Sequence, residues 1–99
     1  MGVDLVLVLD AVRDLEDGYA WYEKRRPGLG EEFLSCVDAC FEGIRRDPER
    51  HERIFEDYRR ALVRRFPYAV FYEHSKTAVT VYAILHTSRS PAKWRTRLP

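Results

Sequence analysis

The stretch RRALVRRFPYAVFYEHSKTAVTVYAILHTSRSPAKWRTR, from Arg59 to Arg97, decides the fold. It predicts two or three antiparallel strands followed by a basic tail. A strand over Ala61–Phe66 is interrupted by Pro67, and another follows over Tyr68–Glu73. After a polar turn at His74–Thr77, the next strand, Ala78–His86, alternates, with Val79, Val81, Ala83 and Leu85 on one face and Thr80, Tyr82, Ile84 and His86 on the other. Because both faces are fairly apolar, we expect helices over one and a half-covered groove over the other.

The residues before this stretch predict one strand and two helices. Val3–Leu9 is apolar and rich in β-branched side chains, which is typical of a strand buried on both faces. Asp10 is expected to cap a helix that extends to Arg26. The inward face of this helix is predicted as Val12, Leu15, Tyr19 and Tyr22, and its wet side as Asp14, Glu16, Asp17 and Glu23. A second helix is predicted over Leu29–Arg46, with an inward stripe of Phe33, Val37, Cys40, Phe41 and Ile44.

The connections between these elements predict the architecture. The two helices are joined by a short link, so we expect an antiparallel hairpin. Glu49–Asp57 is charged and is interpreted as a loop with an ill-defined short strand around Ile54–Phe55, and Pro91 begins a short helix or turn that carries Trp94. The predicted order is β-α-α-β-β-β, an α+β fold in which the helical hairpin packs on a small, mainly antiparallel sheet. We expect residues 1–99 to form one domain.

Charge is divided unequally along the chain. Residues 58–99 carry nine basic side chains and one acid, Glu73, whereas residues 1–57 carry eight basic and fifteen acidic side chains. The formal net charge of +1 therefore conceals an acidic first half and a basic second half. Such asymmetry indicates an anionic partner, either nucleic acid or an acidic protein segment.

Several functional classes are disfavoured by the sequence. Cys36 and Cys40 are four residues apart on a predicted helix, where Cβ atoms are about 5–6 Å apart, too far for a disulfide, and no further Cys or His lies at zinc-finger spacing. We expect buried thiols, no metal and no cofactor. No run of about 18 apolar residues is present, which argues against a helical membrane span. Met1–Leu9 lacks the basic leader of a signal peptide, so we expect a cytoplasmic protein.

The candidates for chemistry are few, and each has a structural alternative. His86 ends the last predicted strand near Arg89 and could serve as acid or base, or it could simply bind backbone. Tyr68, Tyr72 and Tyr82 could stack on bases or pack at the edge of the core. Arg59, Arg60, Arg64 and Arg65 straddle one predicted strand, so at most half of them can address one ligand.

The ordered set Phe66-Pro67-Tyr68, Val70-Phe71-Tyr72, Leu85-His86, Arg89, Pro91 and Trp94 resembles the RelE/ParE superfamily of toxins from bacterial type II toxin–antitoxin modules. RelE-like members cut messenger RNA on the ribosome, and ParE-like members inhibit DNA gyrase. Carried over by position, the RelE-type basic sites match Arg60 and Arg89, but the others fall on Leu62 and Ala69, and the terminal tyrosine falls near Trp94. The chain therefore resembles the ParE-like branch more closely.

This resemblance implies a gyrase-inhibiting binder that is neutralised by a cognate antitoxin, and it leaves a homodimer open. The alternative is a ribosome-dependent endoribonuclease that uses His86, Arg89 and Arg60. An acidic, amphipathic antitoxin segment would fold across the half-covered sheet face. The residues expected to contact target or antitoxin are Arg59, Arg64, Arg65, Trp94, Arg95, Tyr19 and Tyr22.

Overall fold

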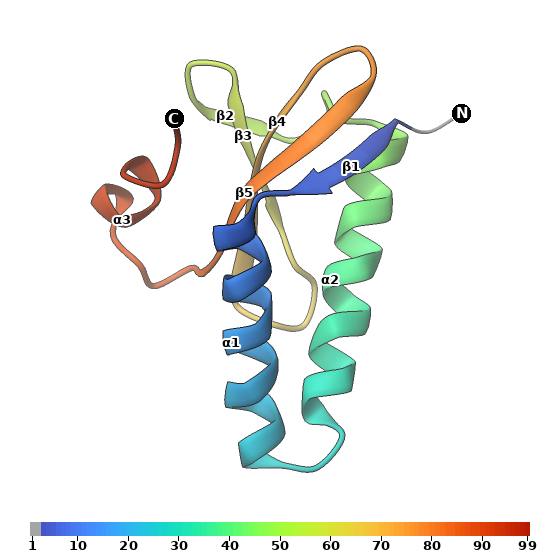
Figure 1. Cartoon of the computed structure of the whole chain (residues 1–99), viewed down its shortest axis with the longest axis vertical. Helices are drawn as coiled ribbons and strands as arrows, with labels where there is room; N and C mark the ends of the chain where they lie inside the picture. Colours follow the sequence, from blue (N-terminus) through green and yellow to red (C-terminus); the bar gives the residue numbers. More distant parts are fainter. Residues whose placement is uncertain (1–2) are drawn as a thin grey trace.

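The computed structural model describes residues 3–99 and confirms an α+β fold (Figure 1). Its elements are β1 (Asp4–Leu7), α1 (Leu9–Arg25), α2 (Leu29–Arg46), β2 (Glu52–Phe55), β3 (Tyr58–Leu62), β4 (Tyr68–His74), β5 (Ala78–His86) and α3 (Pro91–Arg95). The ill-defined strand of the charged loop is a full strand, β2, so four strands rather than three follow the helices. None of the helices in the described part is long and apolar enough to cross a membrane.

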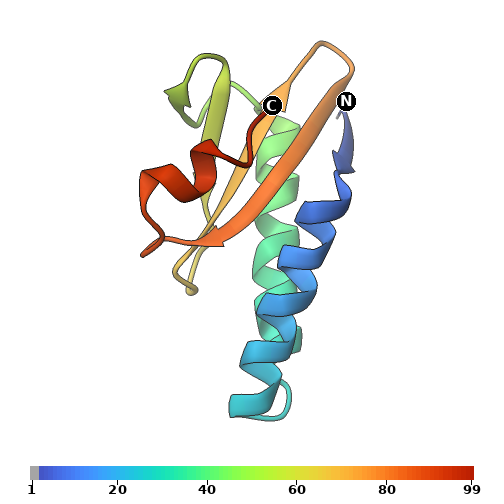
Figure 2. The ribbon, with the colours of Figure 1, turned by 60° about the vertical axis from the view of Figure 1, so that its left-hand side comes forward.

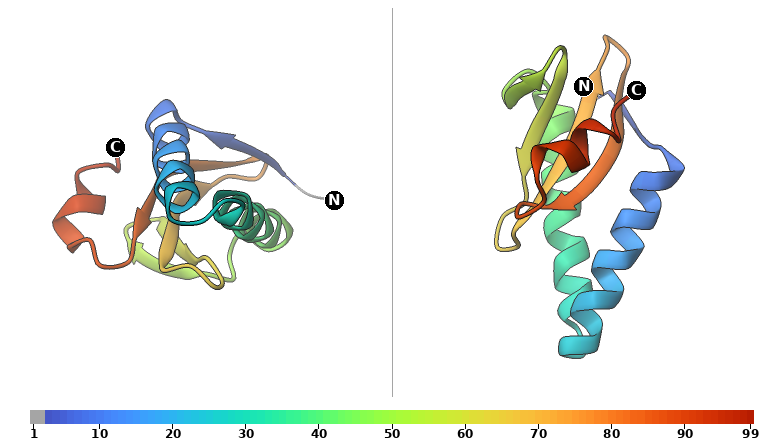
Figure 3. Two further views of the ribbon diagram at one scale, coloured as in Figure 1. Left: turned by 90° about the horizontal axis from the view of Figure 1, so that it is seen from below. Right: turned by 90° about the vertical axis from the view of Figure 1, so that its left-hand side faces the viewer.

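The strands form one sheet in the order β1-β5-β4-β3-β2. β1 pairs in parallel with β5, and the other neighbours are antiparallel. The hairpin of α1 and α2 covers one face of this sheet, while α3 lies against the opposite face (Figures 2 and 3). We call these the helix face and the tail face.

The first strand is shorter and less buried than the sequence predicts. Val3–Leu9 was expected to be a strand buried on both faces, but β1 ends at Leu7 and lies at the edge of the sheet. Leu5 and Leu7 pack against the core, whereas Val6 is 51% exposed. The prediction was wrong because only the helix face of this strand is covered.

The first helix differs from its predicted pattern at the start and along its inner face. It begins at Leu9 with Val8 as the N-cap, so Asp10 lies inside the first turn, where a carboxylate favours the helix dipole but is not the cap. Leu15 and Tyr22 pack on the core as predicted. The fully buried positions are Ala11 and Gly18, and Val12 is not among the residues packed against the core.

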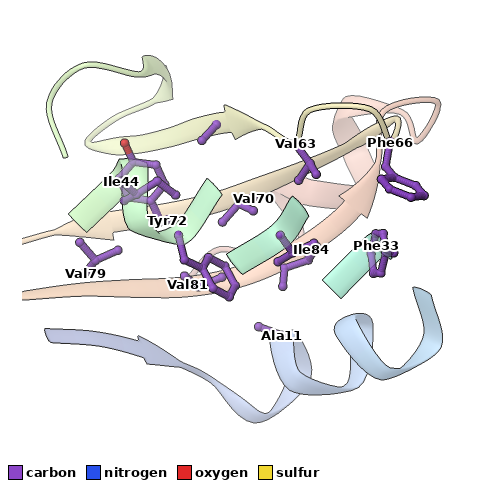
Figure 4. Close-up of a cluster of buried hydrophobic side chains, with 13 residues drawn as sticks. Ala11, Phe33, Ile44, Val63, Phe66, Val70, Tyr72, Val79, Val81 and Ile84 are labelled. Atoms are coloured by element: carbon purple, nitrogen blue, oxygen red, sulfur yellow. The ribbon is translucent and has the colours of Figure 1, made fainter. Parts of the chain in front are cut away.

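The second helix, α2, matches the prediction in its bounds. Phe33, Val37, Phe41 and Ile44 are buried along its inward stripe, with Cys40 partly buried beside them. Figure 4 shows Phe33 and Ile44 directed towards the strands. Cys36 and Cys40 are both free thiols and are half-buried rather than buried.

A bulge at Tyr82 changes which side chains of β5 share a face. Phe71 pairs with Ala83 and Tyr72 pairs with Val81, so Tyr82 is an extra residue in β5. Val79, Val81 and Ile84 therefore face the helices, whereas Ala83 and Leu85 belong to the cluster on the tail face. The predicted alternation was wrong beyond Val81, because one inserted residue reverses the facing of every later side chain.

The tail face carries its own small core. Tyr58, Ala69, Phe71, Ala83 and Leu98 are buried there, and Trp94 stacks on Phe71 with ring centroids 5.5 Å apart. The Tyr58 hydroxyl donates a hydrogen bond to the Pro99 carbonyl at 3.1 Å. The half-covered groove expected on this face is therefore filled by the chain's own C-terminal segment.

Candidate functional site

The two arginines of β3 point to opposite faces of the sheet, and both are engaged by the protein itself. On the helix face, Arg59 Nη1 donates to the carbonyls of Glu49 and His51 at 3.0 and 2.7 Å, which holds the loop after α2. On the tail face, Arg60 Nη2 lies 2.8 Å from Glu52 Oε1. Both side chains are thus held by neighbouring groups of the chain, and the charge of Arg60 is balanced by Glu52.

Arg64 and Arg65 do not belong to a strand, because β3 ends at Leu62. The prediction that four arginines straddle one strand was wrong, because the chain turns between β3 and β4, where Arg65 has a left-handed backbone with φ of 73° and Pro67 follows. Arg65 Nη2 lies 3.2 Å from Glu32 Oε1. Arg64 is exposed and forms no salt bridge within residues 3–99.

A group of uncompensated positive charges lies on the C-terminal segment. Arg89, Lys93 and Arg95 are exposed and form no salt bridge within the described part of the chain, and no acidic residue follows Glu73. We call these three residues the C-terminal cation cluster. The guanidinium of Arg95 lies 4.0 Å from the ring centre of Phe55, a cation–π contact that fixes its position. The sheet therefore has no continuous cationic face, and these three free cations project from α3 and the loop before it, separately from exposed cations such as Arg64 and Lys76 in the turns between strands.

An ion pair that the sequence reasoning missed fastens this segment to the body of the protein. Arg97 Nη1 and Nη2 donate to Asp14 Oδ1 and Oδ2 at 3.2 and 2.8 Å, and Asp14 Oδ2 also accepts the Ile84 N–H at 2.9 Å. The side chains of Asp14 and Arg97 are only 14% and 23% exposed. The prediction that Asp14 lies on the wet side of α1 was wrong. Its spacing from the small residues Ala11 and Gly18, three and four positions away, was the signal that could have placed it inward.

His86 lies in a groove of about 540 Å³ between α1 and the end of β5. Its ring packs edge-on against the Tyr68 ring, with ring centroids 5.4 Å apart, and its Nδ1 accepts a hydrogen bond from the Ser88 N–H at 3.0 Å. This bond leaves the ring proton on Nε2. Burial is the main cause that raises the pKa of Tyr68, which makes its phenol a poor partner in proton transfer at neutral pH.

The three residues of the nuclease hypothesis are not brought together. Arg89 follows closely after His86, and its N–H donates to the His86 carbonyl at 3.0 Å. His86 pairs with Tyr68, which packs on the helix face, whereas Arg60 pairs with Phe71, which belongs to the tail face. The sheet therefore separates Arg60 from His86.

Tyr19, Tyr22 and Trp94 have structural partners. Tyr22 packs between Phe33 and Phe66, with ring centroids 5.2 and 4.8 Å away, and burial is the main cause that raises its pKa. Tyr19 lies close to Gly30 on α2, and the charge of Glu23 is the main cause that raises its pKa. Trp94 is half-buried on the tail face.

One exposed aromatic residue was not singled out from the sequence. Trp21 is 54% exposed on the outer side of α1 and lines the groove that holds His86 and Arg89. The Arg25 guanidinium lies over its indole, 3.8 Å from the ring centre. Its position off the inward stripe of α1 was the available signal, since a large aromatic side chain on the wet face is a frequent binding anchor.

Comparisons with known proteins agree with this fold. A family model described as "ParE toxin of type II toxin-antitoxin system, parDE" matches residues 5–91. A solved structure from P. aeruginosa, described as a chromosomal ParDE TA system, superimposes with a TM-score of 0.75 at 12% identity, covering 85% of this chain and 95% of that one. No curated protein sequence matches the chain.

Proposed function

The chain belongs to the ParE toxin family of type II toxin–antitoxin systems, and we propose that it is a toxin that inhibits DNA gyrase by binding and is neutralised by a cognate antitoxin. We further propose that it acts in the cytoplasm, where gyrase meets its DNA. The observation that carries the proposal is the C-terminal cation cluster, which is exposed and has no acid beside it in the sequence after Glu73. Such a surface is suited to bind an anionic partner.

The arrangement favours binding over RNA cleavage. Cleavage through a 2′-hydroxyl needs a base, an acid and cations that converge on one phosphate. Arg60 and His86 lie on opposite faces of the sheet, and Arg60 is paired with Glu52. The positions of Leu62 and Ala69, which match basic sites of the nuclease pattern, offer no cation.

Among the residues expected to make contacts, we assign Arg64 and Arg95, with Arg89 and Lys93, to the target surface. Arg59 and Arg65 contact other groups of the chain, so we do not assign them to this surface.

For the antitoxin we propose the groove between α1 and β5. Trp21 offers an apolar anchor there, and Arg89 in the lining and Arg25 over Trp21 offer charges that complement an acidic segment. Of the two acids in the lining, Asp14 is paired with Arg97, which leaves Asp17 as the exposed one. Tyr22 and Trp94 shape the protein beneath these surfaces and are not assigned direct contacts.

The test compares DNA supercoiling by gyrase with messenger integrity in a translating extract, using the purified full chain. We expect inhibition of supercoiling with intact messenger. The triple substitution Arg89→Gln, Lys93→Gln and Arg95→Gln should weaken inhibition strongly, and raising the salt concentration should weaken the wild type in the same way.

The matched control is Lys76→Gln, which removes an exposed cation from the β4–β5 turn and should leave inhibition unchanged. Messenger cleavage that is lost in His86→Ala, with supercoiling unaffected, would instead establish the nuclease. Inhibition by the triple variant equal to wild type would remove the C-terminal cation cluster from the target surface.

A further inference from the structure

The outer edge of β1 is open to another strand. β1 pairs only with β5 among the described strands. The Asp4 N–H donates to the carbonyl of Thr77, just before β5, and the Val8 N–H donates to the carbonyl of Val81 in β5, at 3.1 Å each. Since a trans peptide points its C=O away from the following N–H, the carbonyls of Val3 and Leu7 point away from β5. By the same alternation, both backbone groups of Leu5 face outward too.

The protein itself satisfies the first of these outward groups. Arg45 of α2 donates from Nε to the Val3 carbonyl at 2.8 Å. This contact shows that a donor placed beside the edge binds it readily. Leu5 and Leu7 continue the same edge and have no strand on their outer side within residues 3–99.

A groove of about 710 Å³ runs beside this edge, between β1 and α2. Leu5, Val6 and Phe41 supply its apolar lining, and its charged lining consists of Asp4, Asp38, Glu42 and Arg45. Arg45 is occupied by Val3 and by Glu42, whose Oε2 is 3.1 Å from Nη1. Asp4 and Asp38 are exposed and form no salt bridge within the described residues.

We propose that this edge docks a short, extended, basic segment of another protein, which adds a strand beside β1. Main-chain pairing with Leu5 and Leu7 supplies the affinity. Because Leu5 and Leu7 face the helices, Asp4 and Val6 face the tail side, whereas Asp38 and Phe41 belong to α2 on the helix side. On each side an apolar side chain of the segment covers Val6 or Phe41, and a basic side chain pairs with Asp4 or Asp38. This surface carries charge of the opposite sign to the C-terminal cation cluster, so the inference is independent of gyrase binding.

A second copy of the chain fits the edge less well. Antiparallel pairing of two β1 strands brings the acidic groove of one copy next to that of the other. Like charges facing each other across an interface are destabilising, and a basic segment removes this repulsion. The charge of the groove therefore selects the occupant.

The test uses the isotopically labelled full chain and, as probe, a short peptide with blocked ends that repeats Lys-Lys-Val-Val, so that each face of the added strand presents both lysine and valine. We expect the backbone amide signals of Leu5 and Leu7 to shift and to gain protection from hydrogen exchange as the peptide is added. A peptide that repeats Glu-Glu-Val-Val should leave both amides unchanged.

Substitutions of the two acidic residues measure how much their charges contribute to binding of the lysine peptide. Asp4→Asn and Asp38→Asn should each weaken lysine-peptide binding by about two- to five-fold, as expected for exposed ion pairs. Glu16→Gln, an exposed acid on α1 away from the groove, should have no effect. All three positions are exposed, so thermal unfolding should stay as in the wild type.

Three results would overturn the proposal. The first is that the amide signals and the hydrogen-exchange protection of Leu5 and Leu7 stay unchanged at millimolar lysine peptide. The second is that the glutamate peptide binds as tightly as the lysine peptide. Alternatively, both amides could be protected without any peptide, in step with a concentration-dependent rise in molecular mass. That last result would identify a second copy of the chain as the occupant.

Discussion

Replacing Asp14 should destabilise the protein far more than its place on a surface helix implies. The carboxylate joins three segments: α1, which carries it, β5 through the Ile84 N–H, and the C-terminal segment through Arg97. Asp14→Ala removes all of these bonds at once. Asp14→Asn keeps an acceptor for the Ile84 N–H but removes the charge and one of the two oxygens that accept from Arg97.

The magnitude follows from burial. Leaving a buried N–H without an acceptor costs about 1–3 kcal/mol, and breaking a fully buried ion pair costs about 3–5 kcal/mol. Asp14 and Arg97 are 14% and 23% exposed, so water recovers part of this cost. We expect Asp14→Ala to lower the free energy of unfolding by about 3 kcal/mol and Asp14→Asn by about 1–2 kcal/mol. For a domain of this size, about 3 kcal/mol corresponds to a decrease in Tm of roughly 12–24 °C.

The measurement is urea unfolding followed by circular dichroism, with Tm from calorimetry. Asp17→Ala is the matched control, because Asp17 lies one turn further along α1 and is exposed. It should change the free energy of unfolding by less than about 0.5 kcal/mol. Arg97→Met, measured alone and together with Asp14→Ala, completes a double-mutant cycle that gives the coupling between the two side chains.

Two results would refute this account. Equal effects of Asp14→Ala and Asp17→Ala would place Asp14 on the wet side of α1 after all. Strictly additive effects of Asp14→Ala and Arg97→Met would show that the ion pair does not hold the C-terminal segment.

Three further predictions concern buried groups. Gly18→Ala should destabilise by about 1–3 kcal/mol, because its Cβ would lie 2.7 Å from the ring of the fully buried Phe33; Gly43→Ala, with nothing within 4 Å, should stabilise by about 0.5–1 kcal/mol in the same urea assay. Burial raises the pKa of Tyr72 from its ordinary value of 10 to about 12, so the unfolded chain loses this proton before the folded protein does. The free energy of unfolding should therefore be unaffected by this group below pH 10 and should fall as the pH rises from 10 towards 12. Tyr72→Phe should reduce this fall, and an unchanged slope of the free energy of unfolding against pH would contradict the prediction. Burial also raises the pKa of Cys40 to about 11, so the folded protein should be alkylated by iodoacetamide at this thiol about 100-fold more slowly at pH 8 than a thiol of ordinary pKa 9; mass spectrometry of peptides would detect equal rates if this is wrong.

The parts of the fold that repeat a simple period could be read from the sequence. The inward stripe of α2 has helical spacing and ends at Asp47-Pro48, so its bounds of Leu29–Arg46 follow directly from the pattern. The bounds of β5 follow in the same way from its alternation between polar turns. Local periodicity is enough for such elements, because each residue reports on the same buried surface.

The parts that depend on distant contacts could not be read in this way. The bulge at Tyr82 arises from the pairing with β4, and no single residue of β5 predicts it. Aspartate is a residue type that usually faces solvent, and the burial of Asp14 becomes favourable through Arg97, which lies far along the chain. The same limitation affected the candidate site, since Arg59 and Arg60 were counted as free cations before their partners were known.

The contact between Asp14 and Arg97 spans 83 positions of the chain, and β1 pairs with a strand that begins at Ala78. During synthesis, α1 and β1 therefore leave the ribosome long before their final neighbours exist. The helical hairpin can form early from local contacts, but the sheet closes only when nearly the whole chain has emerged. A nascent or truncated chain that ends before Trp94 would expose Phe71 and its apolar neighbours. Quality-control proteases and chaperones would then recognise the incomplete protein by that surface.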